Sequence, residues 1–208
     1  VAQTDEVMLK MGVYTLEKGE DNLQTSQIDD LYLYVVTNDS PGKVVKIRKV
    51  VLRRTNSLTL HHGENFVEAS ISDQSFLYLG THTSPGQVIK VRKDDLAHDG
   101  KMQLQAGMTS LTMQADTNNL YICTFTAPGR ILKVNKADMQ VRDVTQTQLA
   151  LRTGESWLLT SQSDRQYLYV CTSETPGVVV KVRKQDMTIV GQTTLQTGES
   201  LIQTSQID

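Results

Sequence analysis

Cysteine is scarce in this sequence, and long apolar stretches are missing. Cys123 and Cys171 are the two cysteines among 208 residues. Two are too few for a scaffold held by disulfides, and their separation of 48 positions matches no zinc-binding motif. No run of 18 apolar residues is present, so the sequence predicts no membrane span.

Neither sign of charge is in clear excess. The chain has 21 Lys and Arg against 23 Asp and Glu. A nucleic-acid-binding protein needs a net basic face, so we expect no nucleic-acid partner. Leucine-rich helical stretches are also missing, whereas Thr, Ser, Gln and Val are plentiful, a composition that favours strands.

What the sequence does contain is a repeat with three landmarks. A Pro-Gly pair recurs with spacings of 44, 43 and 48 residues, at Pro41-Gly42, Pro85-Gly86, Pro128-Gly129 and Pro176-Gly177. A Gly-Glu pair occurs at 19–20, 63–64, 154–155 and 198–199, and is degraded to Gly107-Met108 in the third copy. An Asp follows each of these glycines by nine or ten residues, at Asp29, Asp73, Asp116, Asp164 and Asp208.

Four short strands are predicted in each unit. The first follows Gly-Glu, as in 23–28, and the fourth leads into the next Gly-Glu, as in 58–60. The second strand is predicted at 31–37, 76–81, 120–124 and 167–172. The third is predicted at 43–48, 87–92, 130–135 and 178–183. These runs are β-branched or aromatic and are bounded by Pro-Gly, Asp or Gly, as strands usually are.

The residues between the strands predict particular turns. Proline followed by a glycine with positive φ is typical of a type II turn, which we expect at each Pro-Gly pair, between strands two and three. The Asp before strand two predicts an Asx-turn that closes the first hairpin. The Lys-x-Arg-Lys segments are expected to be solvated turns that lead into strand four.

The second strands are apolar on both sides, which indicates sheets that are covered on both faces. Leucines point one way, at Leu33, Leu77, Leu120 and Leu168, and tyrosines the other, at Tyr34, Tyr78, Tyr121 and Tyr169. A unit of about 44 residues with four antiparallel strands is typical of a β-propeller blade. The alternative, a parallel β-helix, usually has shorter rungs and lacks a Pro-Gly hairpin at one fixed place. We therefore predict an all-β propeller.

The repeat starts and stops within a unit. Met8–Leu16 aligns with Met187–Leu195, in strand four, and the last strand one stops at Asp208. We therefore expect residues 1–208 to form a single array of four full repeats with a partial one at each end. The array is either part of a longer chain, which the mature or truncated look of Val1–Asp5 also suggests, or is completed by a neighbouring subunit, since open strand edges pair readily.

The repeat unit, best seen in 76–96 and 167–187, resembles the YVTN and NHL-like β-propeller repeats. It is closest to the Pro-Gly-x-Val-Val-Lys-Val repeats of protist and algal extracellular proteins, some of them associated with flagellar hairs (mastigonemes). The resemblance covers essentially the whole chain. It implies an extracellular or cell-surface location and a filamentous or other surface assembly, whereas propellers as a class host many functions.

Candidate chemical sites are few, because chemistry needs residues that break a repeat. The histidines at 61, 62, 82 and 98 occur in different phases and are expected to be surface residues in loops. The recurring Glu and Asp are expected to be structural, in turns or buried hydrogen bonds, and the two cysteines to be buried and not bonded to each other. We therefore predict no catalytic residue, no metal ligand and no cofactor.

Trp157 is the one tryptophan. Because Asn22 and Ser110 align with it, we expect it to be partly buried, with ligand stacking as the alternative. The next position is apolar in every copy and is the better core candidate, at Leu23, Val67, Leu111, Leu158 and Ile202.

Glycosylation is expected at the Pro-Gly hairpin tips if the protein is secreted. Asn38 begins an Asn-x-Ser sequon, which the following Pro41 makes a poor acceptor. Thr83, Thr126 and Thr175 have the surroundings of O-glycosylation sites.

The sequence as a whole favours a non-enzymatic structural or interaction module whose partners are other protein subunits, by self-assembly or in a larger surface complex, with glycans a further candidate partner. Two alternatives remain open. One is a lactonase- or lyase-like enzyme, which would require non-repeating His, Asp, Glu or Asn at the inner ends of strand one. The other is a soluble ligand-binding propeller with its site at the central channel.

Overall fold

The computed structural model describes residues 13–140 and 148–200. Within them, four antiparallel sheets of four strands follow one another along the chain, and each is one blade. Blade 1 comprises β1 (Leu23–Ile28), β2 (Tyr32–Thr37), β3 (Lys43–Arg48) and β4 (Arg53–Thr59), with a short 3₁₀ turn, η1 (Lys49–Val51), before β4. Blade 2 comprises β5 (Val67–Ser72), β6 (Phe76–Thr81), β7 (Gln87–Arg92) and β8 (His98–Gln103). Blade 3 comprises β9 (Ser110–Ala115), β10 (Asn119–Thr124), β11 (Arg130–Asn135) and β12 (Gln148–Ala150). Blade 4 comprises β13 (Leu158–Ser163), β14 (Tyr167–Thr172), β15 (Val178–Arg183) and β16 (Thr188–Thr194).

The predicted fold class is confirmed, because each unit of the repeat is one blade. The third strands, β3, β7, β11 and β15, have the bounds that the sequence predicts, and the second strands differ from prediction by at most one residue at one end. In every blade the strands pair in chain order, so each blade is a meander. Among the described residues no helix is long and apolar enough to cross a membrane.

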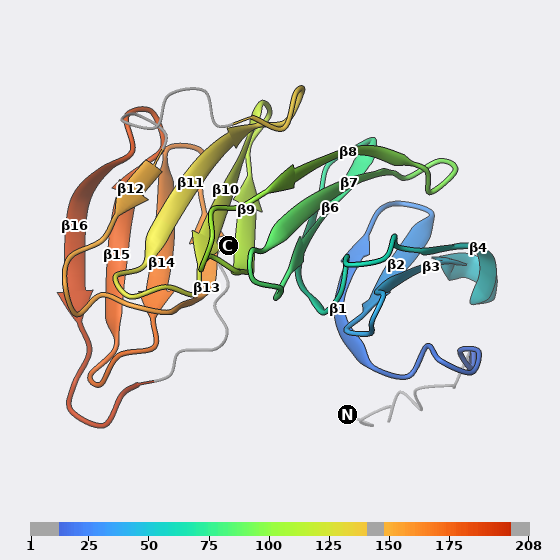
Figure 1. The fold of residues 1–208 in the computed structure, drawn as a ribbon, viewed down its shortest axis with the longest axis horizontal. Helices are drawn as coiled ribbons and strands as arrows, with labels where there is room; N and C mark the ends of the chain where they lie inside the picture. Colours follow the sequence, from blue (N-terminus) through green and yellow to red (C-terminus); the bar gives the residue numbers. More distant parts are fainter. Residues whose placement is uncertain (1–12, 141–147, 201–208) are drawn as a thin grey trace, which may run out of the picture.

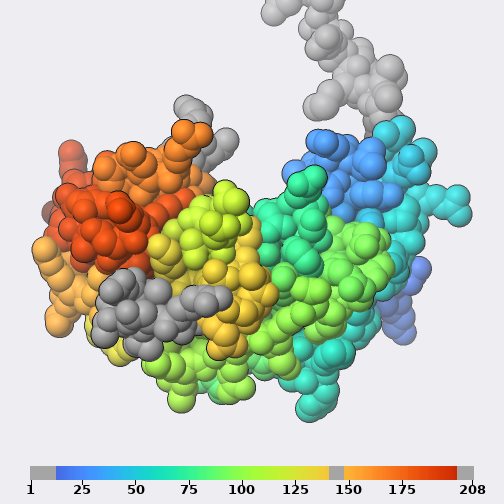
Figure 2. All heavy atoms as spheres, turned by 90° about the horizontal axis from the view of Figure 1, so that it is seen from above, coloured from blue at the N-terminus to red at the C-terminus, as the bar shows by residue number. Residues whose placement is uncertain are grey.

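The blades are arranged around an arc. The first strands of successive blades, β1, β5, β9 and β13, contact one another in that order and form its inner side. Figure 1 shows the four sheets side by side, with blade 1 at one end and blade 4 at the other. Seen from above, the molecule curves from its blue end to its red end and is hollowed between them (Figure 2).

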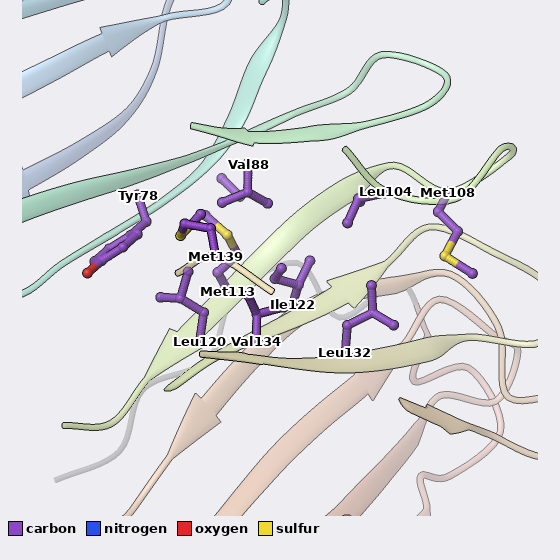
Figure 3. Close-up of a cluster of buried hydrophobic side chains, with 11 residues drawn as sticks. Tyr78, Val88, Leu104, Met108, Met113, Leu120, Ile122, Leu132, Val134 and Met139 are labelled. Atoms are coloured by element: carbon purple, nitrogen blue, oxygen red, sulfur yellow. The ribbon is translucent and has the colours of Figure 1, made fainter. Parts of the chain in front are cut away.

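The core lies between the blades. Tyr78 and Val88 of blade 2 face Leu120 and Ile122 of blade 3, and all four side chains are buried (Figure 3). Tyr34 packs in the same way against Leu77 and Leu79 of blade 2, and Tyr121 against Leu168 and Val170 of blade 4. The tyrosine face of each blade therefore meets the leucine face of the next, as expected for sheets covered on both sides.

The type II turn predicted at Pro-Gly is wrong. The four peptide bonds before Pro41, Pro85, Pro128 and Pro176 are cis, and the glycines that follow do not have positive φ. The positive φ lies instead in the Gly-Glu turn, with φ of 81° at Gly19, 87° at Gly63 and 87° at Gly154. Because each of these glycines is the third residue of a four-residue turn closed by the Glu N–H, the Gly-Glu pair has the type II signature.

The Pro-Gly glycines are needed for close packing between blades. Gly42, Gly86 and Gly129 each donate a backbone hydrogen bond to the turn that begins the next blade, to the carbonyl oxygens of Glu64, Met108 and Glu155 at 3.0, 2.7 and 2.8 Å. A Cβ atom on Gly129 would lie 2.7 Å from Leu158 Cδ2, which is closer than Cβ atoms approach their neighbours. These positions therefore require glycine because the next blade leaves no room for a side chain. The periodicity of the sequence does not reveal this requirement.

The third blade is one residue shorter between the Gly107 turn and β9, and this shifts the predicted core position. Thr124 pairs with Ser110, where Thr81 pairs with Val67 and Thr172 with Leu158. Ser110 is therefore the buried residue and Leu111 lies in the β-bulge, opposite to the prediction. The core prediction is confirmed for Val67 and Leu158, is wrong for Leu23, which is 49% exposed, and falls outside the described residues for Ile202.

The partial units expected at the two ends lie largely outside the described residues, which exclude 1–12 and 201–208. Within them, Tyr14 and Leu16 pack against Val35, Val45 and Ile47 on the leucine face of blade 1. Leu58 and Leu60 of blade 1 pack against blade 2 in the same way, so Tyr14 and Leu16 take the place that strand four of a preceding blade would have.

Candidate functional site

The inner side of the arc is a groove lined by the first strands. It has a volume of about 340 Å³, and its lining includes Thr25, Gln27, Ser70, Thr112, Gln114 and Ser161. These hydroxyl and amide groups hydrogen-bond across the blade boundaries: Thr25 to Ser70 at 2.6 Å, and Thr112 to Ser161 at 2.8 Å. Glu68 is the charged side chain among the described residues that line it. The groove is therefore polar and nearly neutral.

Glu68 owes its position to a β-bulge. The pairing of β5 with β6 shifts register between Val67 and Ala69, so Glu68 is the extra residue, and bulges commonly redirect a side chain. Its Oε1 atom lies 3.0 Å from His82 Nδ1 and accepts a hydrogen bond from Asn38 Nδ2 at 3.4 Å. A non-repeating Glu, His and Asn thus meet at the end of the groove, which sequence periodicity did not reveal because they come from two blades.

Aromatic side chains extend from this cluster along the same end of the groove. The ring of His82 lies edge-on to Phe125 with centroids 6.0 Å apart, and Phe125 lies 6.1 Å from Trp157. Phe125 is 37% exposed and Trp157 is 40% exposed, so Trp157 is partly buried as expected. We call Glu68, His82, Phe125 and Trp157 the aromatic rim. It offers ring faces for stacking beside one carboxylate.

The sequence predicted solvated turns at the Lys-x-Arg-Lys segments, and this prediction is wrong for the last lysine of each segment in blades 2 to 4. Lys93, Lys136 and Lys184 are each at most 8% exposed. Each ammonium donates to the carbonyl oxygen of the Asp that starts the second strand of its own blade, at 2.8–2.9 Å. Two of them also reach the Asp carboxylate of the preceding blade: Lys93 to Asp29 at 3.1 Å and Lys136 to Asp73 at 2.8 Å.

The recurring Asp residues are structural, as predicted. Asp29 Oδ1 accepts the backbone N–H groups of Leu31 and Tyr32 at 3.0 and 2.8 Å, forming the expected Asx-turn, and its Oδ2 accepts the hydroxyl of Tyr34 at 2.9 Å. Burial alone would raise the pKa of Asp29, but these hydrogen bonds and Lys93 lower it to about 2. Burial and the Asp29 carboxylate together raise the pKa of Tyr34 well above its ordinary value. The Asx-turn and the tyrosine hydroxyl bond recur in the other three blades, and the lysine of the next blade recurs at Asp73; we call each arrangement an Asp–Tyr–Lys latch.

The tyrosine faces of blades 1 to 3 are each covered by the following blade. The tyrosine face of blade 4 has no such cover among the described residues. Tyr169, Val179 and Leu195 of blade 4 are each partly exposed. Their equivalents in blade 1, Tyr34, Val44 and Leu60, are at most 3% exposed because blade 2 packs on them. We call Tyr169, Cys171, Val179 and Leu195 the blade 4 end face. Within the described ranges, no lysine of a following blade reaches Asp164 beside it.

The sequence predicted that all four histidines are surface residues in loops. This is wrong for His98, which begins β8 and packs against His61. The rings of His61 and His98 stack with centroids 3.9 Å apart, beside the carboxylate of Glu64. Burial lowers the pKa of His98 below its ordinary value, against the opposing effect of Glu64. His61 precedes the Gly63 turn and His98 begins β8, and only the blade's meander brings them together.

The two cysteines are buried and form no disulfide with each other, as predicted, and both are free. Burial raises the pKa of the Cys123 thiol to about 12 and also raises that of Cys171, so neither is a reactive thiolate at neutral pH.

The predicted glycosylation residues lie in the β2–β3 type hairpin loops, and their modification stays a prediction. Thr83 and Thr126 use their hydroxyls within the turn, donating to the carbonyl oxygens of Pro85 and Pro128 at 2.8 Å each. The Asn38 amide donates to Glu68, whereas Thr175 is exposed. Thr175 is therefore the most accessible acceptor of the four.

No protein-family model matches the chain, and no curated protein matches it. Solved structures do share the fold. The chain is similar to the crystal structure of the computationally designed Ika8 protein (TM-score 0.62, 10% identity, 84% of this chain and 50% of that chain). It is also similar to BamB from Moraxella catarrhalis (TM-score 0.59, 13% identity, 83% and 48%) and to hydrazine synthase from Kuenenia stuttgartiensis (TM-score 0.65, 12% identity, 87% and 53%).

These similarities establish a β-propeller-type array of blades and nothing about activity, because the identities are low. The chain spans about half the length of each of these three structures.

Proposed function

We propose that this chain is a non-enzymatic interaction propeller that self-associates through the blade 4 end face. The proposal rests on the different burial of the equivalent tyrosines in blade 4 and in blades 1 to 3. Tyr34, Tyr78 and Tyr121 are buried against a following blade, whereas Tyr169 is partly exposed. Burying apolar surface is the main favourable contribution to protein association, so a blade-shaped partner is the natural occupant.

A second copy of the chain offers a complementary surface. Its blade 1 has a leucine face with Leu33, Val35 and Ile47, and Lys49 at the position of the latch lysines. Lys49 donates to the carbonyl oxygen of Asp29 at 2.6 Å, as Lys93 does to that of Asp73, and in a neighbour it would face Asp164. Tyr14 and Leu16 cover part of this face and would be displaced.

Such a contact is head-to-tail, so it closes into a ring or continues as a filament. The chain covers about half the length of each of the three similar structures, and a ring of two copies would have that full length. The extracellular or cell-surface location is likewise proposed, on the sequence resemblance and the exposed hairpin tip at Thr175.

The test is the mass of the untagged chain by light scattering, with Val179→Glu as the variant and Val50→Glu as the matched control. Val179 is in the end face, whereas Val50 is 85% exposed on η1. We expect a wild-type mass above 23.2 kDa, reduced to 23.2 kDa by Val179→Glu and unchanged by Val50→Glu. A monomer for the wild type, or equal effects of both variants, would contradict the proposal.

The aromatic rim favours a second candidate function, a ligand-binding propeller. Exposed rings beside a carboxylate and a polar groove could stack on a sugar or another flat ligand. Trp157 is the one tryptophan, so its fluorescence reports directly on the rim. A panel of neutral oligosaccharides should change that fluorescence in the wild type and much less in Phe125→Ala; no change with any member of the panel would exclude sugars as the ligand.

A further inference from the structure

A buried carboxylate oxygen at the start of blade 2 lacks a hydrogen-bond partner. The side chain of Glu64 is 0% exposed. Its Oε2 atom accepts the backbone N–H of His61 at 2.8 Å, as the Glu of each Gly-Glu turn does. Its Oε1 atom is buried and accepts no hydrogen bond. A buried carboxylate is costly unless cations neutralise it, so this environment favours a bound cation.

Two imidazoles lie beside this carboxylate. His98 Nε2, which is itself buried without a hydrogen bond, lies 3.4 Å from Glu64 Oε2. His61 Nδ1 lies 3.8 Å from Glu64 Oε1. One ligand atom from each of the three residues lies within 4.8 Å of the others. His98 is fixed, with a side chain 19% exposed, whereas His61 is 67% exposed and its ring is able to turn.

In blade 1 an arginine, rather than a histidine, lies beside the buried Glu of the Gly-Glu turn. Arg54 occupies the position of His98, and its Nη1 atom lies 2.9 Å from Glu20 Oε1 and 2.7 Å from Glu17 Oε2. The guanidinium thus neutralises the buried Glu20. In blade 2, Lys101 Nζ forms an ion pair with Glu64 Oε1 at 3.2 Å, from a side chain that is 48% exposed. Where blade 1 has one guanidinium, blade 2 therefore has two imidazoles and a half-exposed ammonium.

We propose that His61, Glu64 and His98 bind a divalent transition-metal ion of the Zn²⁺ type. Zn²⁺ takes imidazole nitrogen at about 2.0–2.1 Å and carboxylate oxygen at about 2.0–2.2 Å. A small contraction of the cluster, mainly by rotation of His61, brings the three ligand atoms to these distances. The fourth position faces solvent on the exposed side of His61. The ion links the turn before β5 to β8 and so stabilises blade 2.

Zn²⁺ titration of the untagged chain by calorimetry tests the proposal, with thermal unfolding as a second readout. We expect one Zn²⁺ per chain and a Tm that rises with Zn²⁺ concentration, because an ion that binds only the folded state stabilises it. His61→Ala should weaken binding by about 10-fold or more, since loss of even outer partners of a metal site costs that much. Glu64→Gln keeps the turn's acceptor oxygen, should fold normally, and should also lose binding.

His62→Ala and His82→Ala are the matched controls, because both remove a histidine outside the cluster. They should leave Zn²⁺ affinity and the Tm shift unchanged. Co²⁺ in place of Zn²⁺ should give visible absorption of a four-coordinate ion in the wild type and none in His98→Asn. The proposal is overturned if the wild type shows no Zn²⁺ binding with a Kd below about 1 mM, because structural zinc sites bind far more tightly than that. It is also overturned if His62→Ala or His82→Ala weakens binding as much as His61→Ala does.

Discussion

The residues that hold the blades together are polar ones at their ends. In each Asp–Tyr–Lys latch, the Asp accepts two backbone N–H groups and one tyrosine hydroxyl, and in the first two latches a lysine of the next blade as well. The sequence predicted the Asx-turn and the apolar role of the tyrosines. It did not predict the buried lysines, because a charged run between strands usually lies in solvent, and burial arises only when the next blade covers it.

The tyrosine hydroxyl should contribute measurably to stability. Tyr78→Phe removes the bond from the hydroxyl to Asp73 Oδ2 at 3.0 Å, and a hydrogen bond to a charged group typically contributes about 1.5–3 kcal/mol. Tyr169→Phe removes the equivalent bond to Asp164, also 3.0 Å, at the partly exposed end face. In urea unfolding, Tyr78→Phe should lower the free energy of unfolding clearly more than Tyr169→Phe. Equal losses would show that burial between blades does not strengthen the latch.

Acid should weaken the latches. The pKa of Asp29 is lowered from 3.8 to about 2 in the folded chain, and those of Asp73, Asp116 and Asp164 are lowered as well. A lowered carboxyl pKa contributes stability that is present above the unfolded value and is lost as pH falls through the folded value. The free energy of unfolding should therefore fall as pH drops from about 4 to about 2.

Asp29→Asn separates this effect from general acid sensitivity. It keeps the acceptor oxygen of the turn and removes the titrating carboxyl. Urea unfolding of this variant at pH 7 and pH 3 should show a smaller difference than in the wild type, and an identical difference would contradict the role of Asp29.

At the scale of the strand, periodicity predicts most of the fold and turn chemistry predicts less. The third strands are predicted to the residue because each β-branched run is bounded by Pro-Gly on one side and by Arg-Lys, or Asn135-Lys136 in blade 3, on the other. The Pro-Gly turn was assigned wrongly, because a glycine that gives room to a neighbouring blade has the same sequence signature as one that needs positive φ. The shift at Ser110 was missed because one residue fewer between Gly107 and β9 moves the alignment of β9 without disturbing the pattern around it.

The two roles of glycine can be separated by substitution. A Cβ on Gly129 would lie 2.7 Å from Leu158 Cδ2 and 3.1 Å from the Glu155 carbonyl oxygen, so Gly129→Ala should destabilise the fold by about 1–3 kcal/mol. Gly191→Ala in β16 is the control, because its Cβ would meet nothing within 4 Å. Denaturant unfolding should show a loss for the first and a change within about 0.5 kcal/mol for the second. A Gly129→Ala chain as stable as the wild type would refute the close-packing role.

At the scale of the whole molecule, the chain is an arc of blades with two different ends. Each internal boundary buries a tyrosine face against a leucine face, and the blade 4 end face repeats the first of these surfaces. The sequence predicted that each blade has one tyrosine face and one leucine face. It could not predict the aromatic rim or the histidine cluster, because no short motif contains either. The residues of the rim come from blades 2, 3 and 4, and strand pairing within blade 2 brings His61 to His98.

The association of this end face is the central claim, and the molar mass of the untagged chain in solution tests it most directly. The account predicts a species of twice 23.2 kDa, seen as closed rings, or a larger filament, by electron microscopy, and its dissociation by Val179→Glu but not by Val50→Glu. A mass of 23.2 kDa at every concentration, with neither rings nor filaments, would contradict it.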